Sequence, residues 1–289
     1  MSTPPSPLRA WLDQAWDRHA TDTAAVAAEL LAHAPTLPDD ADGAGVLRLA
    51  AHVLLTHAAD AAAMQRLLDA APPHAALEAA ARPARWALAR LQGTPAPACS
   101  DAERWNGLEY LVLVLAARGQ AAQAQALLLA EEAAAAAHPE QPARRAYAAS
   151  ANNVAGALRD GPRGDAAIDT LMLAAARLSR RAWVRAGTWM HVERADYQLA
   201  MCHAALGQAA DAVAHAQACL QRCEAEGAAP DELFFAHECA AHAQHAASDT
   251  AALQHHVAQM QALLARIEDA GMRQFCAETL ARTPAPAAP

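Results

Sequence analysis

Side chains that bind metals in proteins are concentrated between residues 191 and 256. Eight of the fourteen histidines and four of the six cysteines lie in this region. Its segment HECAAH (237–242) comes within one residue of the zinc-binding pattern H-E-x-x-H. The extra residue places His237 and His242 about 140° apart around an α-helix, so the two rings do not share one face. The segment therefore does not predict a metalloprotease site.

Two helical faces in the same region carry ligand-type side chains at one-turn spacing. Glu238, His242 and His245 are spaced as i, i+4 and i+7, and His215 and Cys219 as i and i+4. Such faces can bind zinc or copper. The other interpretation is that the cysteines pack in the interior and the histidines are polar surface residues. We favour the second interpretation and expect no metal. The alternative is a metal-binding or metal-dependent protein that uses these five residues.

Residues typical of covalent catalysis and of nucleotide binding are missing from the sequence. All 22 basic residues other than histidine are arginine, which excludes a P-loop lysine and a Schiff-base lysine. No serine stands in G-x-S-x-G or S-x-x-K, and there is no G-x-G-x-x-G. Cys202 and His203 are adjacent, so on a helix they point about 100° apart and do not form a nucleophile–base pair. We expect no catalytic residue, no cofactor and no enzymatic activity.

Composition points to a helical protein with an acidic surface. Hydrophobic residues make up 54% of the 289 residues but aromatic residues only 4%, because most of the apolar residues are alanine and leucine. Both are strong helix formers. The formal net charge of −9 argues against a nucleic-acid partner. The N-terminus lacks a signal-peptide pattern, and no apolar run is long enough to span a bilayer, so we expect a cytoplasmic protein with reduced cysteines and no membrane contact.

Proline and glycine divide the chain into helical segments. The most linker-like stretch is QGTPAPACSD (92–101), where Ser100 or Asp101 would cap the following helix. The segments 8–34, 43–71 and 73–92 are expected to be helical, either as further pairs of one stack or as a separate bundle. The predicted division is a disordered tail (1–7), N-terminal helical hairpins (8–92), a linker (93–101), repeats (102–271), a capping helix (272–282) and a second disordered tail (283–289).

The helices after residue 102 repeat at intervals of 40 to 45 residues. In the second helix of each pair a small residue recurs, followed at once by a mostly larger one. A packing residue of the first helix lies thirteen positions before each of these small residues, and in most pairs it is itself followed by a small residue. The recurring small residues of the second helices are Ala124, Ala167, Ala212 and Ala252. The packing residues of the first helices are Leu111, Val154, Leu199 and Cys239. Small residues at these places let two antiparallel helices pack closely.

This pattern resembles the tetratricopeptide repeat, and most clearly in LAMCHAALGQAADAVAHAQACL (199–220). The resemblance covers residues 105–270 and implies an all-α, right-handed solenoid of antiparallel helical hairpins. It departs from the family in its longer spacing and in lacking most of the aromatic and proline positions. Such stacks also look like the sensor or scaffold domains of bacterial regulators. The fold that we expect is therefore a TPR-like α–α superhelix.

The resemblance implies that the first helix of each pair lines a concave groove that binds a peptide. Arg194, Tyr197 and Met201 form one stripe of that groove, at i, i+3 and i+7. Asn153 stands where family members that clamp a peptide carboxylate have an asparagine. The lysines that complete the clamp in those proteins have no counterpart in this sequence, which contains no lysine. The implied partner-binding residues are Asn106, Glu109, Asn152, Asn153, Arg159, Arg194, Tyr197, Met201 and Glu238. We expect a non-enzymatic adaptor or scaffold whose partner is a protein or peptide.

Overall fold

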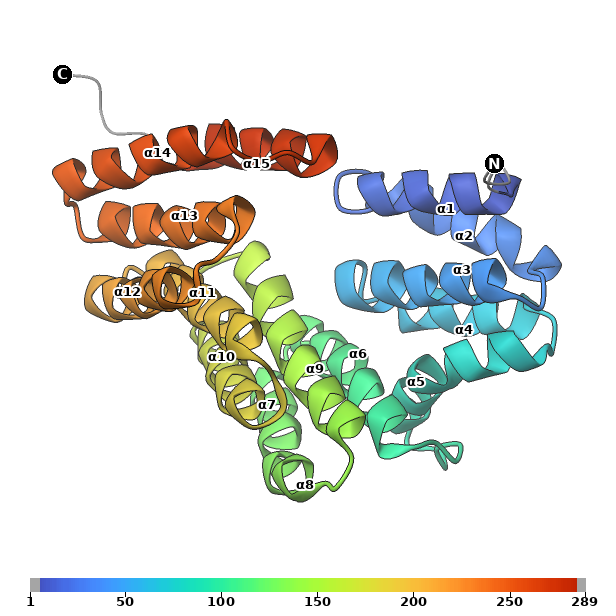
Figure 1. Cartoon of the computed structure of the whole chain (residues 1–289). Coiled ribbons are helices and arrows are strands. Elements are labelled where there is room, and N and C mark those ends of the chain that lie inside the picture. Colours follow the sequence, from blue (N-terminus) through green and yellow to red (C-terminus); the bar gives the residue numbers. More distant parts are fainter. Residues whose placement is uncertain (1–5, 285–289) are drawn as a thin grey trace. The chain divides into compact units, whose positions relative to one another are not determined.

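The computed structural model describes residues 6–284, which are almost entirely helical and contain no strand (Figure 1). The elements up to the first long loop are α1 (Pro7–Arg18), α2 (Thr23–His33), the 3-10 helix η1 (Ala34–Thr36), α3 (Ala41–Ala51), the π-helix η2 (His52–His57), α4 (Ala61–Ala70) and α5 (Ala75–Gln92). They are followed by α6 (Asp101–Ala117), α7 (Ala121–Ala130), α8 (Glu132–Ala137), α9 (Gln141–Asp160) and α10 (Ala166–Ala186). The last helices are α11 (Trp189–Ala205), α12 (Ala209–Glu226), α13 (Pro230–Ala246), α14 (Thr250–Leu264) and α15 (Ala270–Arg282). The prediction of an all-α fold is confirmed.

The chain forms two compact units. Among the described residues, the first contains 6–133 and 138–150, and the second contains 134–137 and 151–284. The division falls inside α9, whereas the sequence placed a linker at 93–101. That segment lies within the first unit, between α5 and α6.

The first unit is built around α3, η2 and α5. In Figure 1, α1 and α2 lie over α3 and α4. Val46, Leu54 and Leu67 are fully buried in the core between these helices. The segments 8–34 and 43–71 each hold more than one helix. In 43–71 the chain turns at Ala59, which adopts a left-handed conformation with φ of 50°, and Asp60 then caps α4. The sequence pattern did not show these breaks, since neither proline nor glycine marks them.

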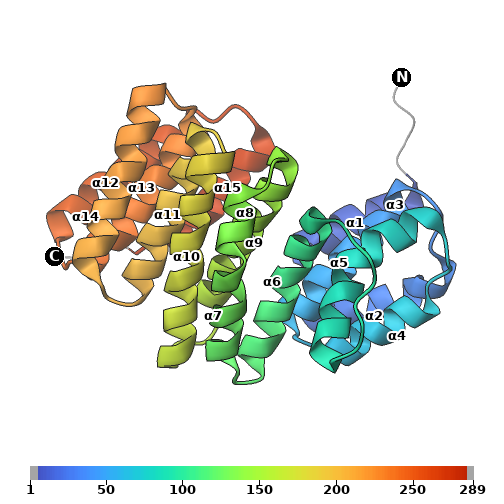
Figure 2. The ribbon, with the colours of Figure 1, turned by 90° about the horizontal axis from the view of Figure 1, so that it is seen from below.

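In the second unit each helix packs against the next one along the chain. Figure 2 shows α10, α11, α12 and α13 side by side, and α11 contacts both α12 and α13. The core between α11, α12 and α13 consists of alanine and cysteine, including Ala200, Ala216 and Cys239. Side chains this small let the helix axes approach closely. Neighbouring-pair packing of this kind is compatible with a helical repeat.

The recurring positions of the first helices are all buried. Their exposed fractions are at most 3%, at Leu111, Val154, Leu199 and Cys239. The second helices differ, because Ala124 and Ala212 are buried, Ala252 is half-buried and Ala167 is exposed. Ala167 lies in the first turn of α10, which places it away from the helix crossing.

The turns inside the pairs use left-handed residues. Gly119, Gly207 and Ser248 have φ values of 76°, 68° and 58°. In the remaining pair this role falls to Gly164 (φ 103°) and not to Gly161. Glycine adopts this conformation without steric cost, and serine does so at a small cost.

Gly107 lets α5 and α6 approach each other. A Cβ atom at Gly107 would lie 2.5 Å from the carbonyl oxygen of Pro83 and 2.9 Å from the Trp86 ring. We expect Gly107→Ala to lower the free energy of unfolding by about 1–3 kcal/mol, because backbone must move to admit the methyl group. The matched control is Gly156→Ala, where the nearest atom to the new Cβ is 3.6 Å away. That change should be neutral or stabilise by up to about 1 kcal/mol. Urea unfolding of both variants tests the pair, and equal effects would contradict the close approach.

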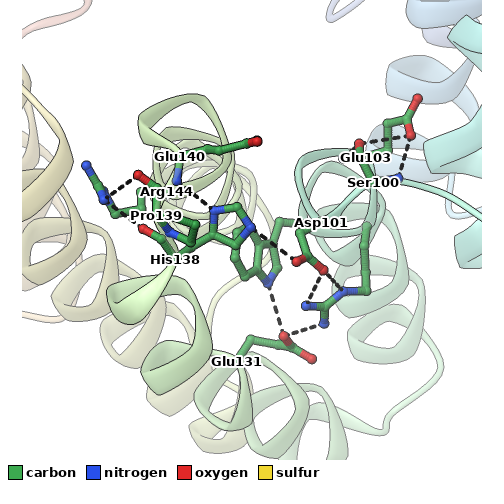
Figure 3. A network of polar contacts seen from close by, with 10 residues as sticks. Ser100, Asp101, Glu103, Glu131, His138, Pro139, Glu140 and Arg144 are labelled. Carbon is green, nitrogen blue, oxygen red and sulfur yellow. Dashed lines mark hydrogen bonds and ion pairs between the residues drawn. The ribbon is translucent and has the colours of Figure 1, made fainter.

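A polar network joins the start of α6 to α7 and to the loop before α9 (Figure 3). Ser100 caps α6 in a capping box with Glu103. The Trp105 indole donates to Glu131 at 3.0 Å, and Glu131 also pairs with Arg104. Figure 3 shows His138 pointing toward Asp101, with 3.2 Å between its Nε2 and the carboxylate. These bonds fix the loop after α8 against α6.

The predicted disordered tails are 1–7 and 283–289. Of these, residues 1–5 and 285–289 lie outside the described part of the chain. Ser6 caps α1, so the helix already includes Pro7. Thr283 is buried and donates to the carbonyl oxygen of Thr279. The helix predicted at 272–282 is present as α15, which packs on α13 and α14.

All six cysteines are free thiols, and five of them are buried. Within residues 6–284, none of the helices combines the length and the apolar character that a bilayer crossing requires.

Candidate functional site

Polar side chains of α11 and α13 meet on one face of the second unit. The Tyr197 hydroxyl donates to Glu238 Oε2 at 2.9 Å. Burial raises the pKa of Tyr197 well above its ordinary value, and the nearby Glu238 carboxylate raises it further. Burial also raises the pKa of Glu238, against the opposing effect of the Tyr197 hydrogen bond. The structure thus joins two residues of the predicted binding set in one hydrogen bond.

Arg159 lies at the end of α9 beside this pair. Its Nη1 donates to Gln198 Oε1 at 3.1 Å, and its Nε pairs with Asp160 Oδ1 at 2.8 Å. Only 19% of the Arg159 side chain is exposed, whereas Asp160 is 67% exposed. A guanidinium held in this way keeps its charge and a fixed orientation.

The ends of α9, α11 and α13 surround a hollow of about 370 Å³. Arg159 and Asp160 supply its charges, Met201 and several alanines supply its apolar surface, and two histidines complete it. The lining residues are Arg159, Asp160, Met201, Ala204, Ala205, Gly207, His242, His245 and Ala246. A hollow of this size is at the lower end of the range of small-ligand pockets and accommodates one or two side chains of a peptide.

His242 enters the hollow uncharged at neutral pH. Its pKa is lowered to about 4, chiefly by burial and further by the neighbouring Arg159 and His245. The ring therefore offers one donor and one acceptor nitrogen. Fixed positive charge in the hollow comes from Arg159, partly balanced by the exposed Asp160.

The other residues of the predicted binding set lie elsewhere. Arg194 is exposed and pairs with Glu232 at the start of α13, so it does not line the hollow. On α9, Asn152 is half-buried and Asn153 is exposed. The remaining members belong to the first unit, where Asn106 is exposed and Glu109 is buried. The structure thus brings together Arg159, Tyr197, Met201 and Glu238, with His242 and His245 of α13.

Three residues of the alternative metal site occupy separate polar pairs, and the other two, His242 and His245, line the hollow. His215 contacts Asp196 at 3.0 Å. Cys219 donates to Glu193 at 2.8 Å, and Glu238 accepts from Tyr197. Within residues 6–284, a group of side chains that could bind a metal ion does converge, but it lies in the first unit. It contains none of the five residues of the alternative site: His215, Cys219, Glu238, His242 and His245.

Two buried carboxylates of α11 were not assigned a role from the sequence. Asp196 is fully buried and accepts from Arg180 Nε at 2.6 Å as well as contacting His215. Burial would raise the pKa of Asp196, but its interactions with His215 and Arg180 outweigh burial and the pKa is lowered. Burial raises the pKa of Glu193 to about 7. The sequence pattern that could have revealed their burial is the spacing of three residues, which places both on the face of α11 that carries Ala200. Acidic residues on a face that packs against other helices need polar partners.

The structure gives no support to a reactive thiol at Cys202. Burial raises the pKa of this thiol to about 11, although Arg159 lowers it in part. A protonated thiol is a poor nucleophile. His203 is also turned away, with its Nδ1 2.6 Å from Gln208 Oε1.

The sequence matches no known protein-family model, and no curated protein matches it significantly. The assignment of function therefore rests on the geometry of the chain itself.

Proposed function

We propose that this chain is a non-enzymatic adaptor or scaffold of the cytoplasm that binds a protein or peptide. In this proposal the second unit is a short, right-handed, tetratricopeptide-like stack. Its support is the packing of successive helices, the buried recurring positions of the first helices and the left-handed residues at the turns. The observation that carries the proposal is the hollow at the ends of α9, α11 and α13.

The lining of the hollow defines the chemistry of the partner. Arg159 presents a fixed guanidinium whose Nε and Nη2 donate to the exposed Asp160 carboxylate, so a carboxylate of the partner would take these paired hydrogen bonds by displacing Asp160. Met201, Ala204 and Ala246 form an apolar surface next to it. The segment that fits is a peptide with an acidic side chain, or a C-terminal carboxylate, beside an apolar side chain.

A peptide-display selection on the immobilised full-length protein tests this proposal. We expect the selected peptides to share a carboxylate next to an apolar residue. Their affinity for Arg159→Glu should be at least tenfold weaker than for the wild type, which is about 1.4 kcal/mol. Fluorescence polarisation with labelled peptides measures the dissociation constants.

Two other charge reversals serve as controls. Arg185→Glu makes the same change on α10, outside the hollow, and should leave the affinity within twofold of the wild type. Arg194→Glu breaks the ion pair between the exposed Arg194 of α11 and the buried Glu232 of α13, outside the hollow, and the folded variant should also bind normally. Selection without any enriched motif, or loss of binding in Arg194→Glu but not in Arg159→Glu, would show that the hollow is not the binding site.

A further inference from the structure

Three histidine side chains converge in the first unit, far along the sequence from the region where metal ligands were expected. His19 follows α1, and His52 and His57 are the first and last residues of η2. The Nε2 atom of His52 lies 3.1 Å from Nε2 of His19 and 3.1 Å from Nε2 of His57. One ligand nitrogen from each ring lies within 4.8 Å of the other two.

The π-helix is what brings His52 and His57 to one face. In an α-helix, residues five apart point about 140° away from each other. A π-helix closes its wider turn with i→i+5 hydrogen bonds, of which Ala58 N to Val53 O at 3.0 Å is one. Residues five apart then lie nearly above one another. Short π-helical turns are rare and occur frequently at functional sites.

The tautomer of His19 is set by the backbone. Its Nδ1 contacts the carbonyl oxygen of Trp16 at 2.5 Å, and a carbonyl oxygen accepts, so Nδ1 carries the proton. In the neutral ring Nε2 then presents its lone pair toward His52. A ligating histidine in metalloproteins is oriented in this way by a hydrogen bond from its other nitrogen.

The indole of Trp16 forms one wall of the cluster. Its ring centre lies 5.3 Å from the His19 ring and 5.4 Å from the His52 ring. The indole limits the movement of both imidazoles and shields them from water on that side. His57 is exposed, which leaves the opposite side open to solvent.

The geometry points to a site for a divalent transition-metal ion, zinc in the first place, bound by His19, His52 and His57. Zinc–nitrogen bonds of about 2.0–2.1 Å at tetrahedral angles separate the ligand nitrogens by about 3.3 Å. Two of the three separations already agree with that value, and a small rotation of the exposed His57 ring brings the third into range. A water molecule or a ligand completes the fourth position. Magnesium and calcium prefer oxygen ligands and do not fit an all-imidazole site.

Calorimetric titration of the metal-free full-length protein with zinc chloride tests the site. We expect one zinc ion per chain with a micromolar or tighter dissociation constant, and no binding of magnesium chloride. His57→Ala should weaken zinc binding at least 100-fold. His57 is exposed, so this variant should keep the circular dichroism spectrum of the wild type.

Two further variants separate ligation from other effects. His57→Glu replaces the Nε2 ligand by a carboxylate oxygen of similar reach and should restore part of the affinity lost in His57→Ala. His255→Ala removes an exposed histidine that lies near His237 and His256 in the second unit, and should bind zinc as the wild type does. Cobalt titration of the wild type provides a test without substitution, since a tetrahedral site gives intense visible absorption.

The contrary results are equally clear. The site is wrong if the wild type binds no zinc, or if His57→Ala binds zinc as tightly as the wild type. Loss of binding in His255→Ala alone would transfer the site to the second unit. Each of these outcomes leaves the peptide-binding hollow untouched, because the two sites share no residue.

Discussion

Glu193→Gln is expected to make the protein more stable than the wild type at neutral and alkaline pH, and to remove part of its pH dependence. Glu193 is 1% exposed, and its Oε2 has no hydrogen-bond partner. Burial raises the pKa of its carboxyl group from 4.5 to about 7; the Cys219 thiol opposes this rise, and the nearby Glu232 adds to it. Glutamine has nearly the same shape and does not ionise, so it avoids the charged form that the interior disfavours.

The direction follows from proton linkage. The folded state holds its proton up to about pH 7, whereas the unfolded chain releases it near 4.5. This stabilisation is therefore complete below the unfolded pKa and is lost as the pH rises through the folded pKa. Between about pH 5 and pH 8 the wild type should lose about 2 kcal/mol that Glu193→Gln keeps.

Urea unfolding of both proteins across this pH range measures the difference, and histidine titration elsewhere cancels between them. Glu224→Gln is the matched control, because it makes the same change at an exposed residue of α12. It should give a profile parallel to that of the wild type. A parallel profile for Glu193→Gln as well would mean that the carboxyl group is ionised in the folded protein at all these pH values.

Trp105→Ala is expected to produce the largest loss of stability, about 3–5 kcal/mol. Trp105 is fully buried at the start of α6, and its ring centre lies 6.0 Å from that of Tyr147. Its indole nitrogen donates to Glu131 at 3.0 Å. Alanine leaves a cavity and removes one partner of that half-buried carboxylate. Calorimetric or urea-induced unfolding measures the change.

The same substitution at Trp16 is the control, since that ring is 39% exposed. It should lower the free energy of unfolding by less than half as much as Trp105→Ala does. Trp105→Phe keeps most of the ring but loses the bond to Glu131, and should fall between them with a loss of about 1–2 kcal/mol. Equal losses at Trp105 and Trp16 would contradict the central packing role of Trp105.

Much of the fold could be predicted because it depends on local patterns. The abundance of alanine and leucine determines the helices, and Gly119 and Gly207 mark turns that need a left-handed residue. The burial of Leu111, Val154 and Leu199 also follows from periodicity, since these residues recur on the inner face of each first helix. Such features require only the chain within a few turns on either side.

The proposed binding site was predictable in part. Tyr197 and Met201 could be placed on one face of α11 from their spacing, and Arg159 and Glu238 on neighbouring helices from the repeat. Arg159 lines the hollow and Arg194 does not. Gln198 of α11 accepts a hydrogen bond from Arg159, and Glu232 of α13 pairs with Arg194, so residues of other helices orient both arginine side chains. A repeat pattern gives the face of a residue but not the partner that orients its side chain.

The tertiary structure alone decided the remaining features. Glu193 and Asp196 become buried because α11 packs against neighbours on several sides, and single-helix periodicity does not count neighbours. The convergence of His19, His52 and His57 required both a π-helical turn and the packing of α1 against α3. The physical reason is common to both cases. The sequence determines the period of each helix, but the local departure from that period and the meeting of distant faces are set by packing.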